Sequence, residues 1–214
     1  MQKPNLTFFL VISLLYILAA HNSYAQAPQW LFSSGSTGND IGMQTRVMPN
    51  GNVVVCGNFR NTIDLDPSTA TYNISSYNGT QDMYLACYSS NGGFIWGFAL
   101  GREDYDGANA LAIDANNNVY IGGFFRGTNV DFDPSSGTAL LTCKGFAGGG
   151  SSDIGGDGFV AKYSSAGAYQ WVLQLGTPYW IEAVDAIAID TGGNVVVGGI
   201  FKDTLDFDPG KIHP

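Results

Sequence analysis

Short apolar segments separated by turn residues alternate along most of the chain. In the clearest stretch, residues 108–113 and 118–125 are apolar on either side of a turn at 114–117, which predicts a β-hairpin. Residues 157–163 and 169–175 follow as a second pair of strands around another turn. Apart from the N-terminal apolar run, no segment sustains the apolar period of about 3.6 residues that marks a helix. The pattern therefore predicts an all-β protein.

The predicted strands are apolar on both faces. Ala110 and Ala112 point to one face of their strand and Leu111 and Ile113 to the other, because side chains alternate along a strand. A sheet with one solvated face would instead alternate apolar with polar residues. We expect four-stranded antiparallel sheets packed face to face around an axis, as in a β-propeller. A β-sandwich or a stacked solenoid of hairpins is the alternative.

The chain repeats itself, which indicates units that cover one another's faces. Residues 52–57, 118–123 and 194–199 align without gaps at spacings of 66 and 76 residues. In the same register, 64–67, 131–134 and 206–209 each read Asp-x-Asp-Pro. Residues 82–90 pair with 157–165, and Trp30, Trp96 and Trp171 close the units. The repeat region is 26–214, with units at about 42–100, 107–175 and 183–214.

These segments carry a resemblance to a known repeat. Residues 117–134 and 157–171, together with 110–114 and 186–190, resemble the SBBP repeat, a bladed β-propeller repeat of large exported bacterial proteins. The likeness extends over residues 29–210. It implies a propeller of several blades in an exported or surface-associated bacterial protein, with no activity established for the repeat. The first copy departs from the pattern, with Met48 in the place of Asp114 and Cys87 in the place of Lys162.

The sequence supplies two complete blades, half of a third and one spare strand at residues 29–33. Closed propellers have about 4 to 8 blades. We therefore expect a fragment of a longer reading frame. Two alternatives are that copies of the chain assemble to close a ring, or that the spare strand pairs with the hairpin at 183–201.

The N-terminus predicts export. Lys3 precedes an apolar run at residues 6–20, and small residues at 23 and 25 predict cleavage after Ala25, so residues 1–25 are a signal peptide. The run is shorter than the roughly 20 residues of a membrane span. We expect a secreted or cell-surface protein without a span after cleavage. The net charge of −9 disfavours nucleic acid as a partner.

The Asp-x-Asp-Pro loops are the first candidate site. Alternate residues of an extended segment point the same way, so each loop places two carboxylates together. Calcium takes about 6 to 8 oxygen ligands, so other groups would have to contribute. The alternative is that the Asp side chains accept backbone N–H groups while Leu65, Phe132 or Phe207 fills the core. The calcium candidates are Asp64, Asp66, Asp131, Asp133, Asp206 and Asp208.

A catalytic apparatus is not recognisable, and we predict no catalytic residue and no cofactor other than calcium. After signal cleavage the sequence keeps one histidine, His213, so a Ser-His-Asp or Cys-His arrangement has no base in its repeats. Cys56, Cys87 and Cys143 form no CxxC pair, which favours buried free thiols over a zinc site, although one disulfide remains open.

The loops that join successive units, at residues 36–41, 102–106 and 177–182, differ most between copies and are the expected recognition surface. Tyr105, Tyr179 and Trp180 could stack on sugar rings, with Glu182 as a hydrogen-bond acceptor, or could fold over the blade edges. The sequence thus predicts a non-enzymatic scaffold that binds an extracellular protein or glycan. The alternative is a propeller hydrolase or lyase with its main catalytic residues elsewhere and Glu103 or Glu182 as contributors.

Overall fold

A computed structural model describes residues 30–145, 156–178 and 181–202. The first sheet is formed by β1 (Ile41–Val47), β2 (Val53–Phe59), β5 (Asp82–Tyr88) and β6 (Phe94–Leu100). The second is formed by β7 (Gly107–Ile113), β8 (Val119–Phe125), β11 (Asp157–Tyr163) and β12 (Tyr169–Leu175). A hairpin of β13 (Ala183–Ile189) and β14 (Val195–Ile200) follows. The remaining elements are β3 (Thr62–Asp64), β4 (Asn73–Ser75), β9 (Val130–Asp131), β10 (Leu140–Leu141) and a short 3-10 helix η1 (Tyr77–Gly79).

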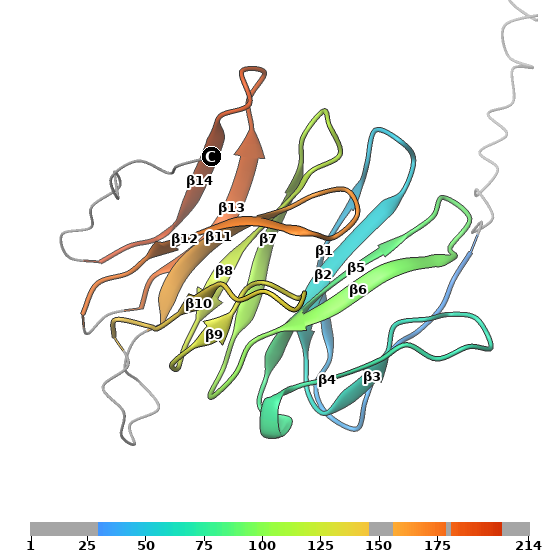
Figure 1. Cartoon of the computed structure of the whole chain (residues 1–214), viewed down its shortest axis with the longest axis horizontal. Coiled ribbons are helices and arrows are strands. Elements are labelled where there is room, and N and C mark those ends of the chain that lie inside the picture. The colour runs from blue at the N-terminus through green and yellow to red at the C-terminus, as the bar shows by residue number, and fades with distance from the viewer. Residues whose placement is uncertain (1–29, 146–155, 179–180, 203–214) are drawn as a thin grey trace, which may run out of the picture.

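Both large sheets are antiparallel, with strand orders β1-β2-β5-β6 and β12-β11-β8-β7. We call them blade 1 and blade 2, and we call β13–β14 the third hairpin. Figure 1 shows the three units fanned out side by side, as an open and partial set of propeller-like blades. The all-β prediction is confirmed, and the predicted strands at 157–163 and 169–175 match β11 and β12.

The turn between β7 and β8 shows why these residues form hairpins. The Asp114 carboxylate accepts hydrogen bonds from the backbone N–H groups of Asn116 and Asn118, at 2.8 Å each. Asn117 adopts a left-handed φ of 64°, which asparagine tolerates better than most residues. Asp190 and Asn194 repeat the same carboxylate bond in the third hairpin. Local turn chemistry therefore fixes the register that pairs the first two strands of a unit.

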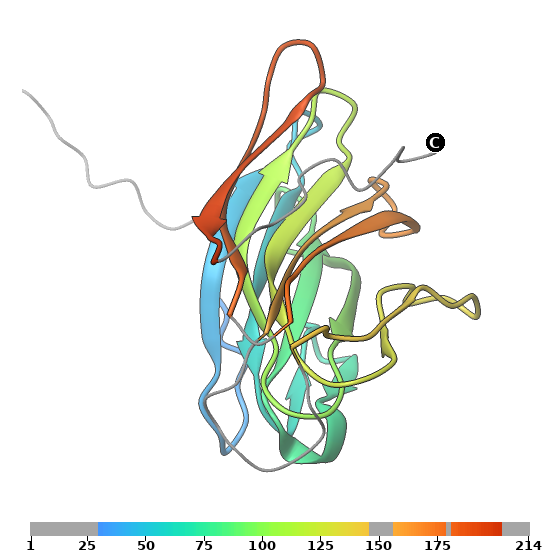
Figure 2. The ribbon, with the colours of Figure 1, turned by 90° about the vertical axis from the view of Figure 1, so that its left-hand side faces the viewer.

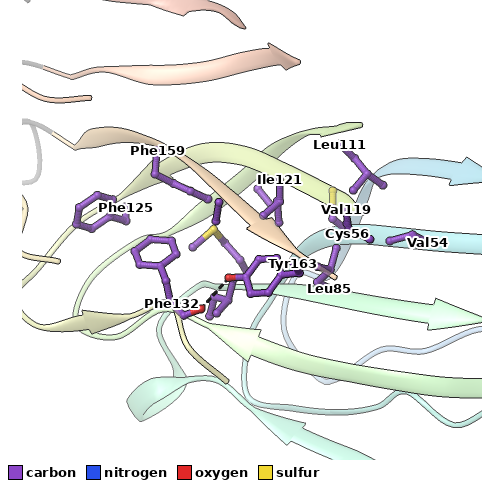
Figure 3. Close-up of a cluster of buried hydrophobic side chains, with 14 of the residues drawn as sticks. Val54, Cys56, Leu85, Leu111, Val119, Ile121, Phe125, Phe132, Phe159 and Tyr163 are labelled. Atoms are coloured by element: carbon purple, nitrogen blue, oxygen red, sulfur yellow. Dashed lines mark hydrogen bonds between the residues drawn. The ribbon is translucent and has the colours of Figure 1, made fainter. Parts of the chain in front are cut away.

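Packing between the sheets buries both faces of the inner strands. One apolar cluster joins β2 and β5 of blade 1 to β7, β8 and β11 of blade 2, as the close-up in Figure 3 shows. Ala110 and Leu111 lie on opposite sides of β7, yet only 3% and 1% of their surfaces are exposed. A second cluster joins blade 2 to the third hairpin through Val160, Val184 and their neighbours. The expectation that each unit covers the next is confirmed.

The Asp-x-Asp-Pro loops form small hairpins, β3–β4 and β9–β10, that the sequence did not predict. In each hairpin the residue directly after the first strand, Leu65 or Phe132, is a buried plug, at 1% and 0% exposure. A buried tyrosine hydroxyl then donates to the carbonyl of that plug: Tyr163 to Phe132 at 2.9 Å, drawn in Figure 3, and Tyr88 to Leu65 at 3.1 Å. The prediction that Leu65 and Phe132 fill the core is confirmed, while Phe207 lies outside the described residues.

The first described residues imitate the outer strand of a blade. Trp30 Nε1 donates to the carbonyl of Ser90, as Trp96 Nε1 donates to the carbonyl of Ser165 in the next unit. Each indole also stacks on the phenylalanine two residues later, Trp30 on Phe32 and Trp96 on Phe98. Residues 30–33 nevertheless form no strand, so the alternative in which a spare strand pairs with the hairpin at 183–201 is not seen in them.

The first strands of the three units, β1, β7 and β13, lie next to one another, along one edge of the molecule in Figure 2. Each contains a bulge at the same position, where the register shifts around Met43, Asn109 and Asp185. Asn109 Nδ2 donates to Asp185 Oδ1 at 2.8 Å and so ties two of these strands together. None of the described residues forms a helix with the length and apolar character of a membrane span.

Candidate binding rim

One end of the blades gathers the loops that the sequence singled out for recognition. There β2 and β8 end, β5 and β11 begin, and residues 101–106 lead from blade 1 to blade 2. Hydrogen bonds link these loops to one another across the end of the sheets. We call this end, with residues 36–41, 60–61, 76–81, 101–106, 126–129 and the described part of 177–182, the rim.

A carboxylate anchors each joining loop just before the first strand of a unit. Asp106 accepts hydrogen bonds from the backbone N–H groups of Arg102, four residues earlier, and Arg126, twenty residues later, at 2.9 and 2.8 Å. Asp40 makes the same two bonds, to Ser36 and Arg60. These acids hold the joining loop against the end of the second strand, so they serve the fold of their own unit.

Glu182 occupies the same place before the third hairpin and differs from the prediction. Its side chain is 0% exposed, and its carboxylate accepts bonds from the hydroxyl of Thr177 at 2.6 Å and from the Thr177 N–H at 3.3 Å. It therefore does not face solvent on the rim as a ligand acceptor. The sequence already indicated that Glu182 is equivalent to Asp40 and Asp106, because the three acids are separated by the repeat spacings of 66 and 76 residues.

Another buried acid begins the third strand of each blade, Asp82 in blade 1 and Asp157 in blade 2. Asp82 is 2% exposed and accepts bonds from the Tyr77 N–H and the Thr80 hydroxyl. Asp157 is 0% exposed and accepts bonds from the Lys144 N–H and from Gln174 Nε2. The repeat alignment had paired these two acids but had given them no role. Each ties the loop ahead of its strand to the rim.

Burial perturbs the acids at the junction between the two blades. Burial raises the pKa of Asp82 to about 7, against the opposing effect of its hydrogen bonds from Tyr77 and Thr80. Burial also raises the pKa of Asp106 to about 8, and the nearby charges of Asp82 and Asp104 add to that rise. Two such carboxyls take up protons close to neutral pH, although neither side chain is open to a substrate.

Arginine and aromatic pairs form the outer surface of the rim. The guanidinium of Arg60 lies 4.8 Å from the ring centroid of Tyr105, and that of Arg102 lies 5.7 Å from the ring of Tyr77. Arg126 forms an ion pair with Asp104, with 4.0 Å between the guanidinium and the carboxylate. Stacking of this kind holds a ring flat while leaving its other face available.

Among the predicted ligand-binding residues, Tyr105 is the one that the structure places on an open surface. It is 46% exposed and lies in the linker between the blades. Tyr179 and Trp180 lie outside the described residues. Glu103, the other acid considered for catalysis, is partly buried, with Thr128 Oγ1 3.5 Å from its carboxylate.

The predicted calcium residues lie in tight turns. Asp64 Oδ1 accepts bonds from the N–H groups of Asp66 and Tyr72, and Asp131 Oδ1 accepts the equivalent bonds from Asp133 and Ala139. The second acids, Asp66 and Asp133, each accept one further N–H. Asp206 and Asp208 lie outside the described residues. In the described ranges no group of three or more His, Cys, Asp or Glu is placed to hold a metal ion.

The three cysteines are buried, as predicted, and Cys56 and Cys87 are free thiols. Burial raises the pKa of the Cys56 thiol to about 12 and that of Cys87 to about 11, so both stay protonated in the core. The Cys143 thiol donates to the carboxylate of Asp157 at 3.1 Å. These contacts give the cysteines a packing role.

Comparison with known proteins supports the repeat architecture. The chain is 25% identical over 193 residues to the uncharacterized WD repeat-containing protein L264 of Acanthamoeba polyphaga mimivirus. The alignment covers 83% of this chain but only 14% of that relative. No family model matches the chain. The WD repeat likeness and the four-stranded sheets together support a β-propeller repeat protein, and this relative does not support the bacterial SBBP type.

Proposed function

We propose that this protein is an exported, non-enzymatic propeller scaffold that binds an extracellular glycan or protein through its rim. The proposal draws on three features: the predicted signal peptide at residues 1–25, the propeller-like blades, and an open aromatic surface at the rim. Assignment to the bacterial SBBP type rests on the segments at 117–134 and 157–171 and is part of the same proposal.

The stack of Arg60 on Tyr105 carries the proposal. Arg60 follows β2 of blade 1, Tyr105 lies in the linker that leads to blade 2, and the tyrosine ring is 46% exposed. The Asp40 and Asp106 carboxylates hold the backbone on both sides of the stack, so the ring is presented from a fixed frame. A flat, partly exposed ring beside hydrogen-bonding groups suits the apolar face of a sugar or an aromatic side chain of a partner protein.

A glycan array probed with the full chain tests the binding role. We expect Tyr105→Ala to abolish binding of any glycan retained by the wild type. Tyr72→Ala is the matched control, because Tyr72 is similarly exposed, at 43%, but lies in the loop between β3 and β4. Its ring packs on Phe94 at the start of β6, the end of that strand opposite the rim. Equal loss in both variants, or no loss in Tyr105→Ala, contradicts a rim site for glycans. If the wild type retains no glycan, crosslinking at position 105 on intact cells tests the protein partner.

The same samples separate binding from turnover. Released reducing sugar is measured on each glycan that the wild type binds, together with a Glu103→Gln variant. We expect no release above the buffer blank from either protein. Release that disappears in Glu103→Gln would support the hydrolase or lyase alternative and overturn a scaffold without catalysis.

Export is tested independently. A reporter enzyme fused after residue 29 is expected to reach the medium or the cell surface, with its new N-terminus at Gln26. A Val11→Arg change within the apolar run is expected to keep the reporter inside the cell, because charge in that run prevents recognition as a signal. Retention of the unmodified fusion in the cell would contradict this part of the proposal.

A further inference from the structure

Blade 1 and the third hairpin lie at the two ends of the blade array. Each exposes one of the two complementary surfaces that pack together between successive units inside the chain. Inside the chain, blade 1 covers the face of blade 2 on which Leu111, Val119, Ile121 and Phe159 lie, and each of these is at most 1% exposed. The residues of blade 1 at the same repeat positions are Thr45, Val53, Val55 and Tyr84. In blade 1 all four are at least partly exposed and line a cavity of about 310 Å³.

The segment from Trp30 to Phe32 already covers part of this blade 1 face. Comparison with the cover on blade 2 shows which strands would fit the uncovered part. On blade 2 the cover consists of β2, β5 and the outer strand β6, from which Trp96 and Phe98 contribute their stacked rings. On blade 1 the stacked rings of Trp30 and Phe32 reproduce that outer strand, down to the bond from Trp30 to the Ser90 carbonyl. Among the described residues, nothing stands in the place of the inner strands. The face therefore suits the inner strands of a blade that lacks an outer strand.

The third hairpin presents such a surface. In blade 1, Val54 and Cys56 of β2 point toward blade 2 and are 0% exposed. The residues at the same repeat positions in β14 are Val196 and Gly198. Val196 is 55% exposed, and Ile200 on the same side of the strand is 60% exposed. Among residues 30–145, 156–178 and 181–202, nothing thus covers the side of the third hairpin that corresponds to the side by which blade 1 and blade 2 each pack on a following unit.

We propose that a second copy of this chain seats its third hairpin on the open face of blade 1, in a head-to-tail contact. The Trp30 to Phe32 segment of one copy then lies beside the incoming hairpin of the other, as the outer strand lies in a complete blade. The open faces lie at opposite ends of the fan, so each copy can join two others (Figure 1). Contacts of this heterologous kind close into a ring or extend into a filament, depending on the rotation between copies.

Substitutions on the two faces test the proposal by sedimentation velocity on the full chain. Thr45→Lys places a charge on the blade 1 face, and Val196→Lys places one on the hairpin face. We expect the wild type to sediment as an assembly that dissociates on dilution, and each variant to sediment as a monomer. Leu140→Lys is the matched control, because Leu140 is 51% exposed on β10, away from both faces, and we expect it to assemble like the wild type.

Mixing the two variants gives the sharpest result. Thr45→Lys keeps an intact hairpin face and Val196→Lys keeps an intact blade 1 face, so an equimolar mixture is expected to form a capped dimer of twice the monomer mass and nothing larger. A wild type that is monomeric at every concentration overturns the proposal. So does an assembly that Leu140→Lys also disrupts, or one that only one of the two face variants disrupts, since a face that pairs with itself would behave in that way. Circular dichroism shows whether each variant remains folded.

Discussion

Asp82 and Asp106 face each other across Gly101 at the junction between blade 1 and blade 2. A methyl group added to Gly101 would lie 2.7 Å from both Asp106 Oδ2 and the carboxyl carbon of Asp82. Gly101 also has a φ of 142°, which residues with a side chain rarely adopt. The absence of a side chain at this one position lets two buried carboxyls share the joining loop.

Replacement of Gly101 by alanine is expected to destabilise the protein by about 2–3 kcal/mol, because overpacking and backbone strain add at this position. Urea denaturation monitored by tryptophan fluorescence measures the loss. Gly193→Ala is the control, since Gly193 has a φ of 83° and no atom within 4 Å of an added methyl group. It is expected to cost about 1 kcal/mol from strain alone. Equal losses at both positions would mean that the carboxyl pair does not restrict Gly101.

Stability is expected to fall as the pH rises from about 4 toward 8. Burial raises the pKa of Asp82 to about 7 and that of Asp106 to about 8, so the folded protein binds protons that the unfolded chain releases above pH 4. Their contribution is therefore fully present at acidic pH and is lost as the pH passes through the raised values. Melting temperatures between pH 4.5 and 8.5 measure the slope.

The variant Asp82→Asn is expected to flatten that slope, because an amide can keep the bonds to Tyr77 and Thr80 but cannot titrate. Asp114→Asn is the comparison. Burial acts to raise the pKa of Asp114, but hydrogen bonds from Asn118, Asn116 and Tyr120 outweigh it and lower the pKa, so Asp114 is ionised throughout this range. Asp114→Asn should shift the melting temperature without changing how steeply it falls with pH. A slope unchanged in Asp82→Asn would show that Asp82 does not titrate between the two states.

Tyr163→Phe is expected to cost about 1–3 kcal/mol, because it removes the hydroxyl that satisfies the buried carbonyl of Phe132. Tyr120→Phe provides the control: the Tyr120 hydroxyl bonds to Asp114, whose carboxylate keeps its bonds from Asn118. We expect that change to cost less than Tyr163→Phe in the same denaturation experiment. The reverse order would contradict the role of the tyrosine in holding the plug residue.

Chelation is expected to leave the melting temperature unchanged. Asp64 and Asp131 each accept two backbone N–H groups through one oxygen, which holds their turns without a metal ion. Melting is compared in EGTA and in calcium chloride. A lower melting temperature in EGTA that calcium restores would instead favour a calcium site at these loops.

Much of the fold follows from local pattern. The apolar faces on both sides of β7 and the repeat spacing predicted the stacked sheets, since neither face of such a strand is stable in water. The small hairpins were not predictable in this way, because β9 contains only two residues and shows no alternation. The outer-strand role of Trp30 was visible from its alignment with Trp96, but its loss of strand structure was not.

The rim was predicted less well than the blades. Exposure of Tyr105 agreed with expectation, whereas Glu182 turned out to be buried. The sequence pattern assigned the whole of each joining loop to recognition. The acid near the end of each loop instead has the same structural role in every repeat. Asp40, Asp106 and Glu182 stand at the same position of successive repeats, which their spacing along the chain shows. The equivalence is easily missed because the third copy has glutamate where the others have aspartate.

The bonding pattern of these acids has a consequence for how such proteins diversify. Asp40 and Asp106 both bind main-chain N–H groups, which every residue except proline possesses. Asp40 also accepts a bond from the Ser36 hydroxyl, whereas the two bonds of the Asp106 carboxylate do not depend on the side chains of its loop. Side chains at positions 103 and 105 can therefore be exchanged while the following sheet keeps its orientation, whereas Asp104 has a φ of 75°, which favours Asp, Asn or Gly. Libraries randomised at residues 103 and 105 should consequently retain the fold, and the junction offers a framework for engineering new specificities.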